Sequence, residues 1–126
     1  MCKKKILNKF ISIYFELLEY IKSFLKESSK EFNLFYKKNI ILRKTNVKMF
    51  IKTWYENISV KYYDKIKNED AEFFFVEERN KQKDNITMYI DLIRDKYNNT
   101  DKNIIKSIIE KIKILTDISI LYFNSN

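Results

Sequence analysis

The chain has no glycine, no proline and no histidine, and its single cysteine is Cys2. Without glycine it lacks the glycine-rich loops that bind phosphate and dinucleotides. Without histidine it lacks the Ser–His and Cys–His pairs of nucleophilic catalysis and the most common metal ligand. A single cysteine excludes an intramolecular disulfide and a thiolate zinc site. We therefore expect no catalytic residue, no cofactor, no metal and no small-molecule substrate, and predict that the protein is not an enzyme.

Aromatic and basic residues are abundant. Ten Phe, nine Tyr and one Trp among 126 residues are far more than disordered chains carry, so we expect one folded domain spanning residues 1–126. The formal charge is +8, with net +10 over residues 1–67 and −2 over residues 68–126. Lys greatly outnumbers Arg, as in proteins from AT-rich genomes, so the charge is either genomic drift or an adaptation to an acidic partner. The uneven placement favours a partner, because uniform drift would not sort the signs.

Apolar residues recur every three to four positions along most of the chain, which is typical of amphipathic helices. The long periodic segments are residues 5–26, 45–67, 84–97 and 100–123. The stripe expected to face inward on the last segment is Ile104, Ile105, Ile108, Ile109, Ile112, Leu115, Ile118, Leu121 and Tyr122. Phe32, Phe35 and Tyr36 indicate a shorter helix after a break at Ser28 and Ser29, and residues 39–42 are either a connector or a helix start. Thr45 or Asn46 can cap the helix that follows. The pattern predicts an all-α fold: a single compact bundle of four main helices with one or two short ones.

The first 26 residues begin with Met1 and a run of lysines before an apolar stretch, which superficially looks like a signal peptide. Glu16 and Glu19 interrupt that stretch, and no small-residue cleavage site follows. No run reaches the ~18 apolar residues that a membrane span requires. We therefore interpret this region as the first structural helix, and expect an intracellular protein without a membrane partner.

Basic residues cluster in the middle of the first half of the chain. No acidic residue occurs between Glu31 and Glu56, and Lys44, Lys48 and Lys52 follow an i, i+4, i+8 spacing. Such a face binds nucleic acid or an acidic protein surface, or is simply solvated. We call this set the basic patch; its members are Lys37, Lys38, Arg43, Lys44, Lys48 and Lys52.

Carboxylates cluster directly after residue 68. This acidic patch consists of Glu69, Asp70, Glu72, Glu77 and Glu78. Its spacing does not fit a calcium loop, so we expect it to contact the basic patch of its own chain or of a second copy. Asp91 and Asp95 form a further i, i+4 pair, which we interpret as a surface pair because Arg94 and Lys96 flank it.

Four aromatic residues lie close to the basic patch. Trp54 and Tyr62 have the helical spacing of core residues, whereas an outward-facing Tyr55 or Tyr63 could stack on bases. Cys2 is expected to be an inert thiol near the start of the chain.

Markers spread over residues 47–123 carry a resemblance to a group of known proteins. They are Trp54, Tyr62, Tyr63, Ile66, Asp70, Phe73, Phe74, Glu77, Glu78, Ile90, Ile93, Leu121 and Tyr122. This pattern resembles small uncharacterised all-helical proteins of nucleocytoplasmic large DNA viruses. The resemblance implies an accessory or virion-associated protein and carries no catalytic residue. In size the chain also resembles the helical apoptosis inhibitors of poxviruses. Their glycine-containing groove motif is absent from this sequence.

These observations lead to two functional hypotheses. The first is a non-enzymatic helical structural or interaction protein, whose lysine-rich half meets an acidic protein or a second copy of the chain as a homodimer. The alternative is a nucleic-acid-binding protein without sequence specificity that uses the same lysines.

Overall fold

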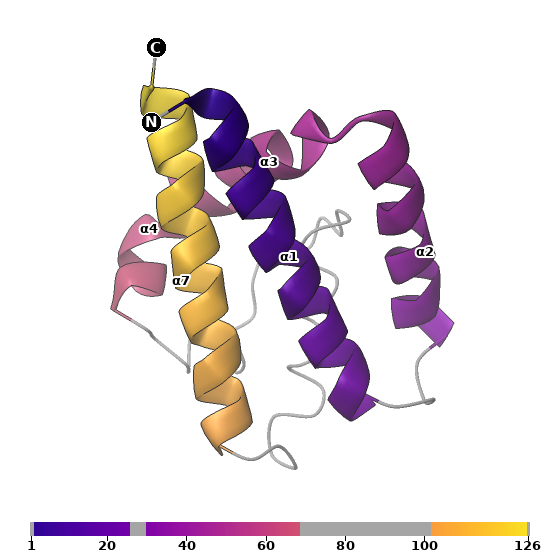
Figure 1. The fold of residues 1–126 in the computed structure, drawn as a ribbon. Helices are drawn as coiled ribbons and strands as arrows, with labels where there is room; N and C mark the ends of the chain where they lie inside the picture. Colours follow the sequence, from indigo (N-terminus) through magenta and orange to yellow (C-terminus); the bar gives the residue numbers. More distant parts are fainter. Residues whose placement is uncertain (1, 26–29, 69–101, 126) are drawn as a thin grey trace.

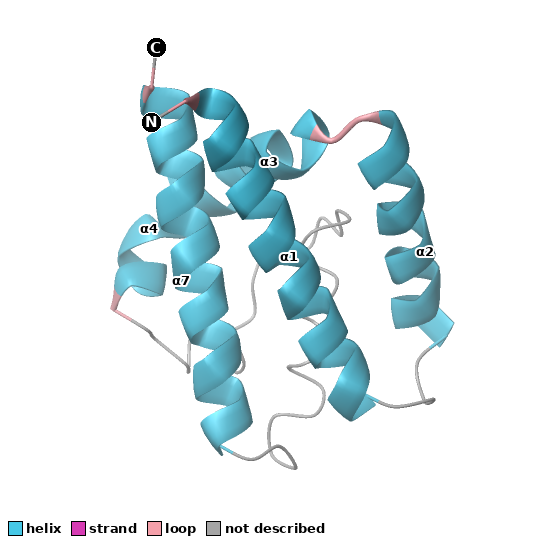
Figure 2. Ribbon diagram, in the orientation of Figure 1, coloured by secondary structure: helices cyan, strands magenta, loops and turns pink. Residues whose placement is uncertain are grey.

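The computed structural model describes residues 2–25, 30–68 and 102–125 of the chain. These residues form five α-helices and one π-helical turn, and none of them lies in a strand (Figure 2). The elements are α1 (Lys3–Leu25), α2 (Lys30–Thr45), α3 (Lys48–Trp54), the π turn η1 (Tyr55–Ser59), α4 (Val60–Lys67) and α7 (Lys102–Asn124). The predicted all-α class is confirmed.

Helix α1 is the central element of the described fold. In Figure 1 it lies between α7 on one side and α2 on the other. Its first turn begins at Cys2, whose carbonyl oxygen accepts hydrogen bonds from the N–H groups of Lys5 at 3.0 Å and Ile6 at 3.2 Å. On the apolar stripe predicted along this helix, Phe10, Tyr14, Leu17, Leu18 and Ile21 are buried, and Ile13 is half-buried. The prediction of a helix over residues 5–26 is therefore confirmed to within two residues of its start.

Helix α7 packs along α1 and confirms the helix predicted over residues 100–123. Isoleucine is a modest helix former, so burial of this face stabilises the helix more than intrinsic propensity does. Ile108, Ile112 and Leu115 are buried as predicted. Leu121 is 48% exposed, so its assignment to the inward stripe is wrong. It lies seven residues after the exposed Ile114, and two helical turns return it to the same outward face.

Helix α2 is longer than the short helix that the sequence predicts. It runs for 16 residues and includes residues 39–42, for which the sequence allows either a connector or a helix start. Asn39 is buried in this stretch: its amide donates to the Phe35 carbonyl at 2.7 Å, and its Oδ1 accepts from the Tyr14 hydroxyl at 2.8 Å. These two bonds give the buried amide polar partners inside the core, and the one from Tyr14 joins α1 to α2.

The segment predicted as a helix over residues 45–67 is helical from Lys48 to Lys67, after a turn at Asn46 and Val47 that ends α2. It is not one regular α-helix, because the π turn η1 lies inside it and Tyr62 leaves helical geometry at φ −128° and ψ 20°, so the prediction is wrong in this respect. The predicted N-cap is also wrong, because the Thr45 hydroxyl donates to the Ile41 carbonyl at 3.0 Å. Val47 precedes α3 without a capping side-chain hydrogen bond.

The π turn η1 directs the side chains of Trp54 and Ser59 towards polar partners on α7. The N–H of Val60 donates to the carbonyl oxygen of Tyr55, five residues earlier. In an α-helix, residues five apart point about 140° away from each other, whereas the wider π turn brings them to the same face. Trp54 Nε1 can therefore donate to Thr116 Oγ1 at 3.1 Å while Ser59 Oγ lies 2.6 Å from Ser119 Oγ.

An aromatic cluster fills the core where α1 and α3 meet. Tyr14 is its centre, with ring centroids 5.0 Å from Phe50 and 6.3 Å from Trp54, and Phe10 lies 6.0 Å from Trp54. Pairs in such tilted or edge arrangements contribute about 0.5–1.5 kcal/mol each beyond the area they bury. The prediction that Trp54 belongs to the core is confirmed.

Several sequence predictions lie outside the described residues. They are the acidic patch at Glu69, Asp70, Glu72, Glu77 and Glu78, the helix over residues 84–97 with Asp91 and Asp95, and the break at Ser28 and Ser29. Within the described ranges, no helix is both long and apolar enough to cross a bilayer.

Candidate interaction surface

The structure exposes all six members of the basic patch. Lys37, Lys38, Arg43 and Lys44 belong to α2, and Lys48 and Lys52 belong to α3. The turn at Asn46 and Val47 lies between the two groups, so the expected row of Lys44, Lys48 and Lys52 along one helix is wrong. Spacing alone could not show this, because the i, i+4, i+8 pattern continues across the turn.

Lysines and aliphatic side chains alternate on the outward face of α2. Leu34 is 61% exposed and Ile41 is 62% exposed. We call this row the α2 stripe; in chain order its exposed members are Lys30, Leu34, Lys37, Ile41 and Lys44. Their spacing of four and three residues places them on one face, and the row contains no acidic residue. The sequence predicts Lys37 and Lys44 on this row but not Leu34 and Ile41, although the i, i+7 spacing of these two among lysines is a signal in the sequence.

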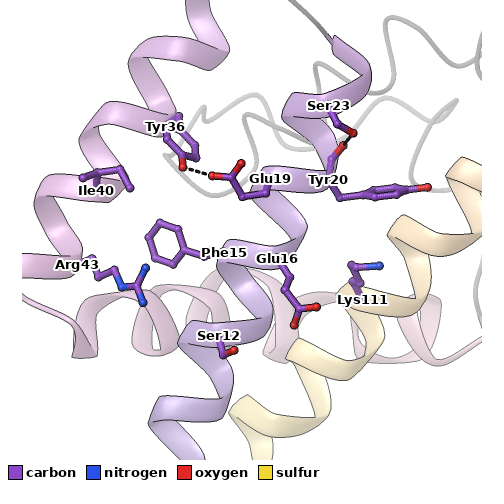
Figure 3. A pocket seen from close by; sticks show the side chains of 10 residues that line it. All are labelled: Ser12, Phe15, Glu16, Glu19, Tyr20, Ser23, Tyr36, Ile40, Arg43 and Lys111. Atoms are coloured by element: carbon purple, nitrogen blue, oxygen red, sulfur yellow. Dashed lines mark hydrogen bonds between the residues drawn. The ribbon is translucent and has the colours of Figure 1, made fainter.

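The opposite side of α2 faces a groove against α1. The groove has a volume of about 620 Å³ and carries side chains from three helices (Figure 3). They are Ser12, Phe15, Glu16, Glu19, Tyr20 and Ser23 from α1, Tyr36, Ile40 and Arg43 from α2, and Lys111 from α7. The guanidinium of Arg43 lies 4.6 Å from the centre of the Phe15 ring, on the groove side of α2. Arg43 is therefore separated from the rest of the basic patch.

Tyr36 lines this groove from α2. Its hydroxyl donates to Glu19 Oε1, and the Lys22 ammonium lies 4.5 Å from its ring centre (Figure 3 shows the hydrogen bond). The hydrogen bond to Glu19 is the main cause of a raised pKa for the Tyr36 phenol, and partial burial adds to it. At neutral pH the phenol is therefore a hydrogen-bond donor, and the groove lining joins α2 to α1 rather than presenting a nucleophile.

The groove is lined by side chains of both charges. Acidic Glu16 and Glu19 face basic Arg43 and Lys111 across it, so it has no dominant charge. In the described part of the chain, no three side chains of His, Cys, Asp or Glu come together as a metal site would require. The groove is therefore a seam of mixed charge between α1, α2 and α7.

The two tyrosines considered for base stacking are both half-buried. Tyr55 stacks on Phe123, with ring centroids 4.5 Å apart, so one of its faces is covered. The Lys67 ammonium lies 5.6 Å from the Tyr63 ring centre. Neither side chain forms the open platform of a single-stranded nucleic-acid site.

Cys2 is exposed just before α1. The backbone N–H groups of Lys4 and Lys5 are the main causes that lower the pKa of its thiol below the ordinary value. The sequence predicts an inert thiol, whereas the lowered pKa increases the population of the nucleophilic thiolate near neutral pH.

No family of proteins, no curated protein and no solved structure matches this chain. The resemblance to viral helical proteins therefore stays a prediction, and the functional argument depends on the surfaces described above.

Proposed function

We propose that this chain is a protein-interaction module whose α2 stripe binds an acidic protein surface. One observation carries the proposal: Leu34 and Ile41 are both more than half exposed, and they lie between lysines on one helical face. The resemblance to proteins of large DNA viruses supports an accessory or virion-associated setting for such a module inside a host cell.

The two aliphatic side chains distinguish this surface from a simple solvated face. Complete burial of a Leu or Ile side chain contributes about 1.5–3 kcal/mol, whereas an exposed ion pair contributes about 0–1 kcal/mol. Affinity on the α2 stripe would therefore come mainly from Leu34 and Ile41. The lysines around them would select an acidic partner and orient it.

Nucleic acid is the alternative partner. Leu34 and Ile41 distinguish it from an acidic protein surface. Phosphate recognition uses charge and does not require exposed aliphatic groups, and this chain has 22 Lys but only three Arg. Binding to phosphates would depend on Lys37, Lys44 and Lys48 and would be insensitive to Leu34 and Ile41.

A binding experiment with three defined probes tests the proposal. The probes are a helical peptide with Leu and Glu alternating at the four-and-three spacing, a poly-glutamate peptide of equal charge, and a 20-base-pair DNA duplex. We expect the Leu/Glu peptide to bind most tightly. The L34S/I41S variant should lose at least about tenfold in affinity for it, because that is the effect of losing 1.4 kcal/mol of apolar contact.

A matched variant on another face controls for general effects. V60S removes an aliphatic group that is 63% exposed on α4, and it should leave the affinity for the Leu/Glu peptide unchanged. If DNA binds as well as the Leu/Glu peptide, with affinity that falls steeply with salt and does not respond to L34S/I41S, the nucleic-acid hypothesis replaces this one. Absence of binding to all three probes overturns both.

A further inference from the structure

Helix α7 carries an outward row that complements the α2 stripe. We call it the α7 stripe; its exposed members are Glu110, Ile114, Asp117 and Leu121. Ile114 is 43% exposed and Leu121 is 48% exposed. Acidic and aliphatic side chains alternate on this row, as basic and aliphatic side chains do on α2.

The two stripes have the same order and the same spacing. Steps of four, three and four residues lead from Lys30 to Ile41, and the same steps lead from Glu110 to Leu121. Parallel packing of the two helices would place aliphatic side chains opposite aliphatic ones and lysines opposite carboxylates. The layers would be Lys30 with Glu110, Leu34 with Ile114, Lys37 with Asp117, and Ile41 with Leu121.

We propose that the acidic partner of the α2 stripe is a second copy of this chain, docked through its α7 stripe in parallel orientation. The inference rests on the proposed function, since it names the partner of the same face. The contact must form between two molecules, because α1 lies between α2 and α7 within one chain (Figure 1). Charge complementarity and matching apolar positions select this occupant among acidic surfaces in general.

Other charges make the contact weak but do not remove its specificity. Lys106 and Lys113 lie beside the α7 stripe, and each chain has a formal charge of +8. Ions screen the repulsion between whole chains beyond about 8 Å at physiological ionic strength, whereas the layered side chains would lie in contact. A single helix pair forms a small interface, so we expect a dissociation constant between about 1 µM and 1 mM.

The contact joins two different faces, so it is head-to-tail. The pair as a whole would still present one free α2 stripe on one molecule and one free α7 stripe on the other, unless rotation closes the assembly. The mass in solution should therefore increase with concentration, measured by sedimentation from about 10 µM to about 1 mM. A constant monomer mass over this range would overturn the inference.

Charge reversal at the layer of Lys37 and Asp117 provides the decisive test. K37E and D117K should each shift the association to at least about tenfold higher concentration, because each opposes like charges in one layer. The K37E/D117K double variant keeps the formal charge of +8 and should recover wild-type association. A mixture of the two single variants should also associate, since each supplies the face that the other requires.

The outcome separates this inference from the proposed function. K61E makes the same change in net charge as K37E at an exposed lysine of α4, and it should leave association unchanged. If the double variant and the mixture fail to recover association, the α2–α7 pairing is wrong. If the chain stays monomeric but the Leu/Glu peptide still binds the α2 stripe, the second copy is excluded while the proposed function stands.

Discussion

Ser59 Oγ lies 2.6 Å from Ser119 Oγ in the buried contact between η1 and α7. A hydroxyl group has one hydrogen to donate, and Ser119 donates its hydrogen to the Thr116 carbonyl at 2.8 Å. The Ser59 hydroxyl must therefore donate to Ser119. This direction gives the two serines different energetic roles although their side chains are identical.

Alanine substitutions should reveal that direction. S119A leaves the buried Ser59 hydroxyl without its acceptor and should lower the free energy of unfolding by about 1–3 kcal/mol. S59A leaves the donor bond of Ser119 intact and should cost about 0.5–1.5 kcal/mol. The double variant should cost less than the sum of the two, because no unpaired group remains. Urea unfolding measures all three, and a larger cost for S59A than for S119A would contradict the assignment.

The Trp54–Thr116 hydrogen bond has a direct spectroscopic readout. The chain has a single Trp, so its spectrum contains one indole N–H signal. T116V replaces the hydroxyl acceptor of Trp54 Nε1 with a methyl group and should cost about 1–3 kcal/mol in unfolding free energy. T116S keeps an acceptor and serves as the control. We expect the indole proton signal to move upfield in T116V only, and an unmoved signal there would exclude the bond.

The long helices could be predicted from the sequence because their apolar periodicity is uninterrupted. Six turns of α1 and of α7 each present one face, and no other regular structure buries that pattern. The break within residues 45–67 could not be predicted, because an apolar stripe from Val47 to Ile66 also fits a continuous helix. The π turn forms because Trp54 and Ser59 both find partners on α7, some sixty residues away in sequence.

The candidate surface was predicted in part for a related reason. Charge is visible in sequence, so Lys37 and Lys44 were identified as exposed. An aliphatic residue in a helical pattern is normally assigned to the core, and only the placement of α2 shows that Leu34 and Ile41 face outward. Asn39 illustrates the converse case, because its burial depends on the Tyr14 hydroxyl, 25 residues away.

The thiol of Cys2 should react faster than an ordinary cysteine. Backbone N–H groups of Lys4 and Lys5 lower its pKa, so the nucleophilic thiolate is more populated at neutral pH. The rate of alkylation by iodoacetamide, followed from pH 6 to pH 9, should reach half-maximum at lower pH in the folded protein than in a peptide of residues 1–8. Superimposable rate profiles would show that the helix start does not activate this thiol.

Tyr14 should make stability depend on pH above pH 10. Burial raises the pKa of its phenol above the ordinary value of 10.0. Between these two pKa values the unfolded chain has released the proton while the folded protein retains it, so the free energy of unfolding falls as pH rises. The stabilisation that the protonated Tyr14 phenol gives the folded protein is fully present below about pH 10. It is lost as pH rises towards the pKa of Tyr14 in the folded protein.

The Y14F variant isolates that contribution from the lysines, which also titrate in this range. At pH 7, Y14F leaves Asn39 Oδ1 without its buried donor and should cost about 1–3 kcal/mol. Because phenylalanine cannot ionise, the difference in unfolding free energy between wild type and Y14F should shrink between pH 10 and pH 11.5. Urea unfolding at half-unit pH steps measures this difference. A constant difference across the range would mean that the Tyr14 phenol ionises equally readily in the folded and unfolded chains.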